Sequence, residues 1–275
     1  MRHHLKTVYN AVAPFVWRAR GCRPWSFGYR EYKREYIRRA VTQMVFDPDQ
    51  IPKGFGRRLD ERVVEYPWFF SRLPQGAGRL LDAGSVLNHD YLLDHRLLTE
   101  KHLFISTLAP EPACYWQRSI SYVFEDLRNM VYRDASFDWI VSLSTVEHIG
   151  MDNTMLYTSD ETKRERDRQA YTLALAEFAR VLKPGGTLFL SVPFGQGRDH
   201  GWFQIFDAEM VDRLIDSFRP QSVTETHFRY LPEGWARSNR ETSRDATYFD
   251  IHKSNGFDAD FAAGSRAVVC LEMMR

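Results

Sequence analysis

The chain has 275 residues, of which 44% are hydrophobic, 14% aromatic and 27% charged, which excludes a disordered or fibrous protein. Its 37 Lys and Arg balance 36 Asp and Glu, so no global basic field exists to hold nucleic acid. Three scattered cysteines without a C-x-x-C pair argue against a disulfide framework and for a reducing compartment. The nine histidines show no ligand spacing such as H-E-x-x-H, and we expect no metal.

The first 60 residues predict a basic, aromatic-rich helical arm that ends in a linker. Residues 1–40 hold ten Lys and Arg and two acids, a local charge of +8, and residues 51–60 carry one Pro and two Gly. No run of 18 apolar residues occurs, so no conventional transmembrane helix is expected. The arm either docks on the protein or a partner, or lies on anionic lipid. The predicted location is therefore cytoplasmic, with peripheral membrane contact through residues 1–40 as an open alternative.

Residues 61–275 predict a single α/β domain, because short apolar runs alternate with helical stretches as in a parallel sheet. The expected strands are 79–83, 103–107, 122–125, 137–143, 187–192, 222–228 and 266–272. The expected helices are 166–182 and 208–218, and residues 150–167 form a polar surface insertion or lid. The segment Lys183-Pro184-Gly185-Gly186 predicts a structural turn between a helix and a strand.

The first predicted strand leads into a glycine turn, Asp82-Ala83-Gly84-Ser85. A glycine at this point lets the backbone approach a ligand closely, and ligands of doubly wound folds bind at the carboxyl ends of strands. Only one glycine is present, so the dinucleotide fingerprint G-x-G-x-x-G is absent. An ordinary tight turn is the plainer interpretation of this segment taken alone.

Three later segments, taken together with this turn, carry a resemblance. They are Glu125-Asp126-Leu127, the stretch SFDWIVSLSTVEHIG at 136–150, and EFARVLKPGG at 177–186. In this order they resemble the class I S-adenosylmethionine-dependent methyltransferases, and most closely the group with an EHIG segment that is often linked to surface-glycan assembly. The resemblance implies a Rossmann-like, mostly parallel sheet of seven strands, with S-adenosylmethionine as the cofactor.

The resemblance also implies positions for the cofactor. The loop after the first strand would hold the methionine part, and the end of the second strand would face the ribose. The acid after the third strand would face the adenine, and the fourth strand would lie near the sulfur. The residues at these positions are Asp82, Ala83, Gly84, Ser85, Asn88, Thr107, Asp126, Leu127 and Ser144.

Two departures from the family pattern leave a second hypothesis open. The second strand ends in Thr107 instead of the usual acid, so a ribose carboxylate is missing unless Glu111 reaches in from the loop. The first turn has Ser85 where the family usually has a further glycine. The alternative is therefore a non-catalytic binding or scaffolding protein with an eroded cofactor site.

For methyl transfer to a hydroxyl group, a base of near-neutral pKa is useful. His148 is the first candidate, Glu147 would orient it or bind the acceptor, and His200 is a second candidate base. A structural pair of Glu147 and His148 is the plainer interpretation. The loop 193–202 carries glycines, His200 and Trp202, which suit a sugar ring. The predicted acceptor is thus a small molecule or glycan, with an oxygen of a sugar or glycolipid as the methylated atom.

Overall fold

The computed structural model describes residues 2–43 and 46–275. Its centre is an eight-stranded sheet with the order β3-β2-β1-β4-β5-β8-β6-β7. The strands are β1 Arg79–Ala83, β2 His102–Thr107, β3 Ser121–Phe124, β4 Phe137–Leu143, β5 Leu182–Pro193, β6 Ser222–Leu231, β7 Gly234–Ser238 and β8 Ala267–Met274.

The sheet is mostly parallel, as predicted, but it has eight strands where seven were expected. Strands β1 to β5 pair in parallel, whereas β8 runs antiparallel between β5 and β6. The additional strand is β7, which forms a hairpin with β6 at one edge. Its sequence, GWARS, is short and has no clear alternation of apolar residues, so periodicity could not identify it.

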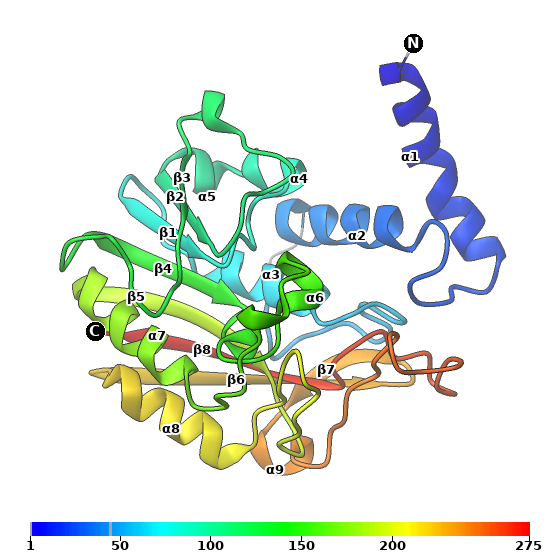
Figure 1. Cartoon of the computed structure of the whole chain (residues 1–275). Coiled ribbons are helices and arrows are strands. Elements are labelled where there is room, and N and C mark those ends of the chain that lie inside the picture. Colours follow the sequence, from blue (N-terminus) through cyan, green and yellow to red (C-terminus); the bar gives the residue numbers. More distant parts are fainter. Residues whose placement is uncertain (1, 44–45) are drawn as a thin grey trace.

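Helices cover both faces of the sheet, which gives three layers (Figure 1). Neighbouring strand residues alternate between the layers, because side chains of a strand point to opposite faces. Leu80 packs in the core that includes α3, whereas Leu81 packs in the core under α7 and α8. The two covering helices on the second face are α7 Tyr171–Val181 and α8 Ala208–Phe218.

Helix α8 confirms the predicted range 208–218, but α7 begins later than the predicted 166. The charged stretch before Tyr171 lies in loops instead, with the short elements α6 Thr154–Tyr157 and η3 Glu161–Lys163. The prediction of a free turn at Lys183-Pro184-Gly185-Gly186 is also corrected. These residues lie inside β5, next to a shift of register between β4 and β5, and Lys183 Nζ lies 2.6 Å from Asp138 Oδ1.

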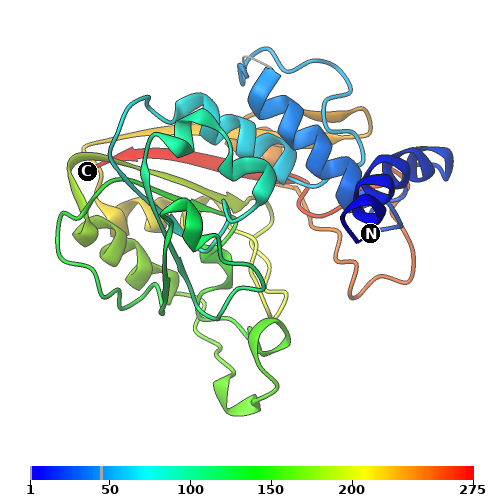
Figure 2. The ribbon, with the colours of Figure 1, turned by 90° about the horizontal axis from the view of Figure 1, so that it is seen from above.

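The N-terminal segment contains α1 Arg2–Ala19 and α2 Tyr29–Gln43, and the domain proper opens with α3 Arg62–Arg72. Helix α1 extends away from the body of the molecule, whereas α2 lies against it (Figures 1 and 2). Trp17, Tyr29 and Ile37 are buried in the same core as α3, so this segment packs on the domain. Whether residues 1–60 form a unit of their own stays a prediction.

The remaining short elements are α4 Asp90–Leu93, α5 Arg96–Thr99, η1 Trp116–Arg118, η2 Val146–His148 and α9 Arg240–Ser243. None of the helices in the described part of the chain is both long and apolar enough to span a bilayer. Membrane contact through residues 1–40 therefore stays a prediction.

Candidate active site

A cavity of about 480 Å³ lies at the carboxyl ends of the parallel strands. Its wall includes residues from the ends of four neighbouring strands, which is where ligands of such sheets bind. We refer to it as the strand-end cavity. Of the residues predicted to bind the cofactor, it is lined by Gly84, Thr107, Asp126 and Leu127, and His148 also belongs to its wall.

Gly84 is required at the end of β1 for two reasons. Its φ of +117° is a conformation that residues with a side chain rarely adopt. A Cβ atom at this position would lie 2.4 Å from Thr145 Oγ1 and Cγ2, so Thr145 occupies the space that glycine leaves. The glycine therefore allows β1 and β4 to approach each other at the cavity wall.

The other predicted residues of this loop shape it and do not line the cavity. The buried Asp82 carboxylate accepts hydrogen bonds from the amides of Val86 and Leu87, at 2.9 and 2.7 Å. Ser85 has a φ of +61°, the left-handed region that favours glycine, so this serine adopts the conformation that a second glycine would take in the turn. The Ala83 carbonyl accepts a hydrogen bond from Ser142 Oγ, and Asn88 Nδ2 donates one to the Ala113 carbonyl.

Asp126 lines the cavity and is held by Arg128. The guanidinium Nη2 lies 2.6 Å from Asp126 Oδ2 and 2.7 Å from Glu165 Oε1, so one arginine bridges two carboxylates. Partial burial opposes ionisation, but the hydrogen bonds from Arg128 outweigh it and lower the pKa of Asp126. Asp126 also accepts a hydrogen bond from the Arg128 amide at 2.9 Å, so the same carboxylate caps the turn that follows β3.

Thr107 is buried at the end of β2, and its neighbourhood does contain an acid. Glu125, directly after β3, also lines the cavity and accepts a hydrogen bond of 2.7 Å from Ser106 Oγ. Its amide donates to the Thr107 carbonyl, which holds the two strand ends together. Glu111 does not line the cavity. The sequence alone assigns no role to Glu125. Its position beside Thr107 depends on the pairing of β2 with β3, which the sequence does not reveal.

The polar segment 150–167, interpreted from the sequence as an insertion or lid, supplies one side of the strand-end cavity. Tyr157, Thr158, Lys163 and Glu165 line it. Arg164 Nε lies 3.2 Å from Asp152 Oδ2, and this ion pair connects the two ends of the segment. The segment thus covers the cavity across from Gly84 and Thr107.

A second cavity, of about 210 Å³, adjoins the first. We refer to it as the inner cavity. Its wall combines the region before and at the start of α3, the end of β4 with η2, and the loop after β5, and residues from distant parts of the chain complete it. Its lining residues include Trp25, Glu61, Arg62, Glu147, His148 and Trp202.

His148 is the predicted base, and it lines both cavities. Its Nδ1 lies 3.0 Å from the Trp202 carbonyl oxygen, which can only accept, so Nδ1 carries the proton when the ring is neutral. Burial, followed by the nearby Arg62 charge, lowers the pKa of His148 to about 4 although the Trp202 carbonyl opposes this. The ring is therefore neutral at pH 7, and the lone pair on Nε2 is left to accept a proton.

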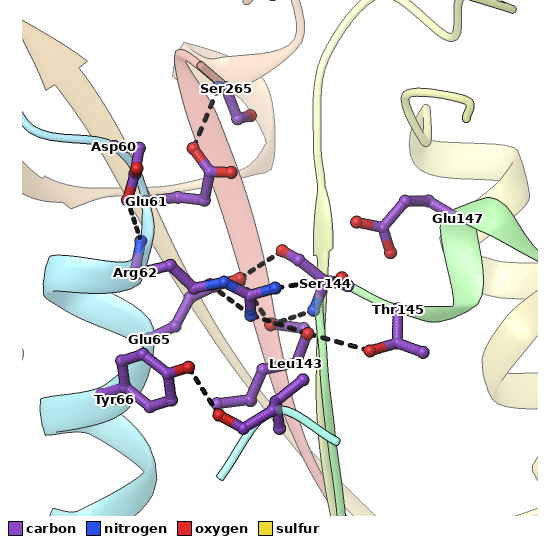
Figure 3. A network of polar contacts seen from close by, with 12 residues as sticks. Asp60, Glu61, Arg62, Glu65, Tyr66, Leu143, Ser144, Thr145, Glu147 and Ser265 are labelled. Carbon is purple, nitrogen blue, oxygen red and sulfur yellow. Dashed lines mark hydrogen bonds and ion pairs between the residues drawn. The ribbon is translucent and has the colours of Figure 1, made fainter. Parts of the chain in front are cut away.

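A buried polar network holds the end of β4 against α3 (Figure 3). Arg62 donates to the carbonyls of Leu143 and Ser144, at 2.7 and 3.3 Å, and lies 3.2 Å from the Glu65 carboxylate. Glu65 in turn accepts from Ser144 Oγ and Ser191 Oγ, at 2.5 and 2.6 Å. Ser144, predicted to face the cofactor, belongs instead to this network and lines the inner cavity.

Glu147 is almost fully buried, with 2% of its surface exposed, and its Oε2 has no hydrogen-bond partner among the described residues. Its other oxygen lies 3.9 Å from His148 Nε2. Burial, assisted by the charges of Glu65 and Glu61, raises the pKa of Glu147 well above its usual value. The predicted structural pair and the predicted acceptor contact are both compatible with this geometry.

His200, the second candidate base, lines neither cavity. Its ring stacks on Phe203 with the centroids 4.5 Å apart, and its Nδ1 lies 3.9 Å from Asp250 Oδ2. Phe203 lines the inner cavity, so His200 packs against a residue of the cavity wall and is not itself part of that wall. Trp202, two residues further on, does reach the inner cavity.

The side chains that sequence reasoning missed lie mostly in the inner cavity. Asp60 and Glu61 stand in the acidic stretch before α3 and line this cavity. Trp25, Lys33 and Tyr248 reach the same space from opposite ends of the chain. No local pattern indicates such residues, although acids next to the apolar α3 sequence were a usable signal for Glu61. Within residues 2–43 and 46–275, no group of three or more acidic, His or Cys side chains is arranged to hold a metal ion.

Comparison with known families gives one match. Residues 105–190, which run from β2 to β5, match the family described as a methyltransferase domain. The matched stretch contains the strand-end residues Thr107, Asp126 and His148. None of the curated proteins compared with the chain matches it.

Solved structures with a related fold are distant. The 1,6-didemethyltoxoflavin-N1-methyltransferase of Burkholderia thailandensis, solved with its substrate and S-adenosylhomocysteine, is 17% identical, with a TM-score of 0.41 and 72% of each chain covered. A possible histamine N-methyltransferase of Thermotoga maritima is 14% identical, with a TM-score of 0.44, and the match covers 74% of this chain and 84% of that chain. These similarities are too weak to indicate an activity or an acceptor.

The matched domain, together with the sheet and its strand-end cavity, defines the chain as a methyltransferase enzyme of the α/β type. Its cofactor is S-adenosylmethionine. The residues present fit this cofactor, because the cavity lies at the carboxyl ends of the parallel strands and its wall carries the Glu125 and Asp126 carboxylates and the Thr107 hydroxyl. That Thr107 faces the ribose, and that Asp126 and Leu127 face the adenine, stays a prediction of the sequence.

Proposed function

We propose that this enzyme methylates a hydroxyl-bearing acceptor of sugar size that binds in the inner cavity, with the cofactor in the strand-end cavity. The observation that carries the proposal is the position of His148, which lines both cavities. A group at this junction can touch an acceptor while it borders the cofactor site. The separation into two adjoining cavities also suits a reaction in which two molecules must meet in line.

When bound, S-adenosylmethionine supplies a methyl group whose bond to sulfur breaks, with the electrons left on sulfur, as the new bond to the acceptor oxygen forms. The hydroxyl proton moves to His148 Nε2, which is free because Nδ1 donates to the Trp202 carbonyl. The Trp202 carbonyl and the Trp202 ring hold the His148 imidazole in place, and the centroids of the two rings lie 5.1 Å apart. Arg62 and Glu65 fix the end of β4 from which η2 and His148 follow.

The lining of the inner cavity supports a sugar or glycolipid acceptor. Trp25, Trp202 and Tyr248 offer ring faces, and carboxyl groups lie between them. Ring faces with directed hydrogen-bonding groups are what a sugar ring requires. The resemblance of the sequence to the group linked to surface-glycan assembly points the same way.

A glycolipid acceptor would also give the N-terminal helices a role. Val12 and Phe15 of α1 are exposed, by 50% and 73%, and residues 1–40 carry a formal charge of +8. Exposed apolar side chains beside basic ones suit an anionic membrane surface. We therefore include peripheral membrane contact of a cytoplasmic protein in the proposal, and sedimentation with anionic vesicles tests it.

The first test is a calorimetric titration with S-adenosylhomocysteine. We expect micromolar binding that weakens at least tenfold in Asp126→Ala, since a charged hydrogen-bonding group is worth ~1.5–3 kcal/mol. Asp216→Ala, an exposed position on α8, is the matched control and should bind as the wild type does. Absence of binding at millimolar concentration would favour the alternative, a non-catalytic protein, which the missing ribose acid at Thr107 supports.

The second test addresses transfer. Methyl-labelled S-adenosylmethionine is incubated with the protein and a panel of sugars and glycolipids, and labelled product is measured. We expect His148→Asn to lower the rate by a factor of 10² to 10⁴, the range of general-base catalysis. A rate unchanged in His148→Asn would exclude the proposed proton acceptor.

A further inference from the structure

The inner cavity contains more acids than bases. Its two basic residues each have an acidic partner, since Lys33 Nζ lies 2.5 Å from Asp60 Oδ2 and Arg62 Nη1 lies 3.2 Å from Glu65. This leaves the carboxyl groups of Glu61 and Glu147 without a basic residue of their own.

Glu147 is the clearer case, because its Oε2 is buried and has no hydrogen-bond partner among the described residues. Figure 3 shows its carboxyl group turned toward the α3 side of the network, with no contact marked. A buried polar atom that lacks a partner destabilises a fold by ~1–3 kcal/mol, so it is rare without a function. Arg62 does not supply the partner, since its guanidinium already serves Glu65 and two carbonyls.

Glu61 stands at the start of α3, and its carboxyl group accepts a hydrogen bond from the Ser265 amide at 3.1 Å. Burial, followed by the charges of Asp60 and Glu65, raises the pKa of Glu61 to about 8. Burial thus disfavours the ionised forms of both Glu61 and Glu147. A cation bound beside both carboxyl groups would favour their ionised forms.

The aromatic walls favour a cation as well. Lys33 Nζ already lies 5.1 Å from the Trp25 ring centroid, within the range of a cation–π contact. Trp202 and Tyr248 line the same space, and neither has a cation of the chain placed over its ring among the described residues.

We propose that the acceptor carries a protonated amine, which the carboxylates of Glu61 and Glu147 bind in the inner cavity while the hydroxyl to be methylated faces His148. This deepens the proposed function and rests on it. The acceptor class is therefore a small amine-bearing polyol of amino-sugar size, as opposed to a neutral sugar. No covalent bond forms in this step, and each carboxyl group that ionises on binding releases its proton to solvent.

The test uses full-length protein saturated with S-adenosylhomocysteine and two matched pairs of probes, glucosamine with glucose and cyclohexylamine with cyclohexanol. Titration calorimetry measures each affinity. Repeating it in buffers of different ionisation enthalpy measures the protons released. We expect each amine to bind at least tenfold more tightly than its neutral counterpart, with net proton release near pH 7.

Glu147→Gln and Glu61→Gln should each reduce this preference at least fivefold, and S-adenosylhomocysteine should bind as in the wild type. Glu209→Gln, an exposed glutamate in the first turn of α8, removes the same charge elsewhere and should leave the preference intact. Equal binding of amine and alcohol, absence of amine binding, or a preference that survives both substitutions would each overturn the proposal. If the wild-type protein does not bind S-adenosylhomocysteine, the proposed function itself is wrong.

Discussion

The two cavities that meet at His148 are built in different ways. The strand-end cavity is assembled from consecutive strand ends, and its lining residues lie between positions 84 and 165. The inner cavity collects residues from position 25 to position 248. The first therefore follows from the topology of a parallel sheet, whereas the second depends on how distant segments pack over it.

They differ in electrostatics as well. In the strand-end cavity, Arg128 bridges Asp126 and Glu165 in a partly exposed setting, so these charges are paired. In the inner cavity, the unpaired carboxyl groups of Glu61 and Glu147 are shielded from solvent. The comparison indicates that the chain itself pairs the charges of Asp126 and Glu165 in the strand-end cavity, whereas the Glu61 and Glu147 carboxyl groups in the inner cavity have no cationic partner among the described residues.

Arg62 offers the strongest way to break the inner cavity. Arg62→Ala leaves the fully buried Glu65 without its cation and removes the hydrogen bonds that Arg62 donates to the carbonyls of Leu143 and Ser144. Removing one partner of a buried ion pair typically destabilises a protein by ~3–5 kcal/mol. We expect a loss of this size in urea denaturation.

Arg38→Ala is the matched control for that experiment. Arg38 pairs with Glu35 on the exposed face of α2, and such pairs contribute less than ~1 kcal/mol. If Arg62→Ala lowers the free energy of unfolding as little as Arg38→Ala does, the Arg62–Glu65 network is not the structural support of the inner cavity.

Gly84→Ala tests the strand-end cavity. The new Cβ would lie 2.4 Å from Thr145 and would sit at a φ of +117°. We expect S-adenosylhomocysteine affinity to fall about 100-fold, ~2.7 kcal/mol, because the loop must move from its position. The double variant Gly84→Ala/Thr145→Ala removes the clash but not the backbone strain, and it should recover part of the affinity. A single variant that binds normally would mean that the glycine is only a turn residue.

Sequence reasoning worked where function follows from local pattern. The ranges of β1 and β4 match the predicted ones, and Gly84, Thr107 and Asp126 reach the strand-end cavity because they stand at or just after strand ends. The sequence does not indicate on which side the Ser144 and His200 side chains lie, and neither lines this cavity. Ser144 turned toward Glu65, and His200 stacks on Phe203.

The convergence of Trp25, Lys33 and Tyr248 on one cavity could not be predicted, because it is a consequence of long-range packing. The same holds for β7, which is defined by its pairing with β6 and not by its own sequence. Conversely, Asp82 was predicted as a ligand from its position alone, and its carboxylate is used by its own loop.

The acid-rich character of the inner cavity predicts a pH dependence of stability. Glu61 has a folded-state pKa of about 8, above its unfolded value of ~4.3. The folded protein therefore holds a proton that the unfolded chain has lost, and stability falls as pH rises from about 5 to 8. The slope from one such group reaches ~1.4 kcal/mol per pH unit.

Glu61→Gln should flatten this slope and make the protein more stable at pH 8, which urea denaturation across pH 5–8 measures. Asp82, whose pKa burial raises to about 7, adds a slope of the same sign and remains in the variant. A variant that gains stability while it loses the amine preference would indicate a residue kept for binding. An unchanged slope would mean that Glu61 is ionised in the folded protein.

Ser85→Gly has the smallest expected effect, since glycine suits the left-handed backbone conformation of this residue. Ser85 has a φ of +61° and a buried Oγ without a partner among the described residues, and both features are unfavourable for serine. Glycine loses more backbone freedom on folding than serine, which offsets part of this benefit. We therefore expect the free energy of unfolding to rise by only ~0.5–1 kcal/mol, or about 2 °C in Tm. Cofactor affinity should not change, because Ser85 does not line the strand-end cavity. A drop in S-adenosylhomocysteine affinity would show instead that the Ser85 hydroxyl binds the cofactor. The strand-end cavity would then also contain a polar group whose partner is a ligand.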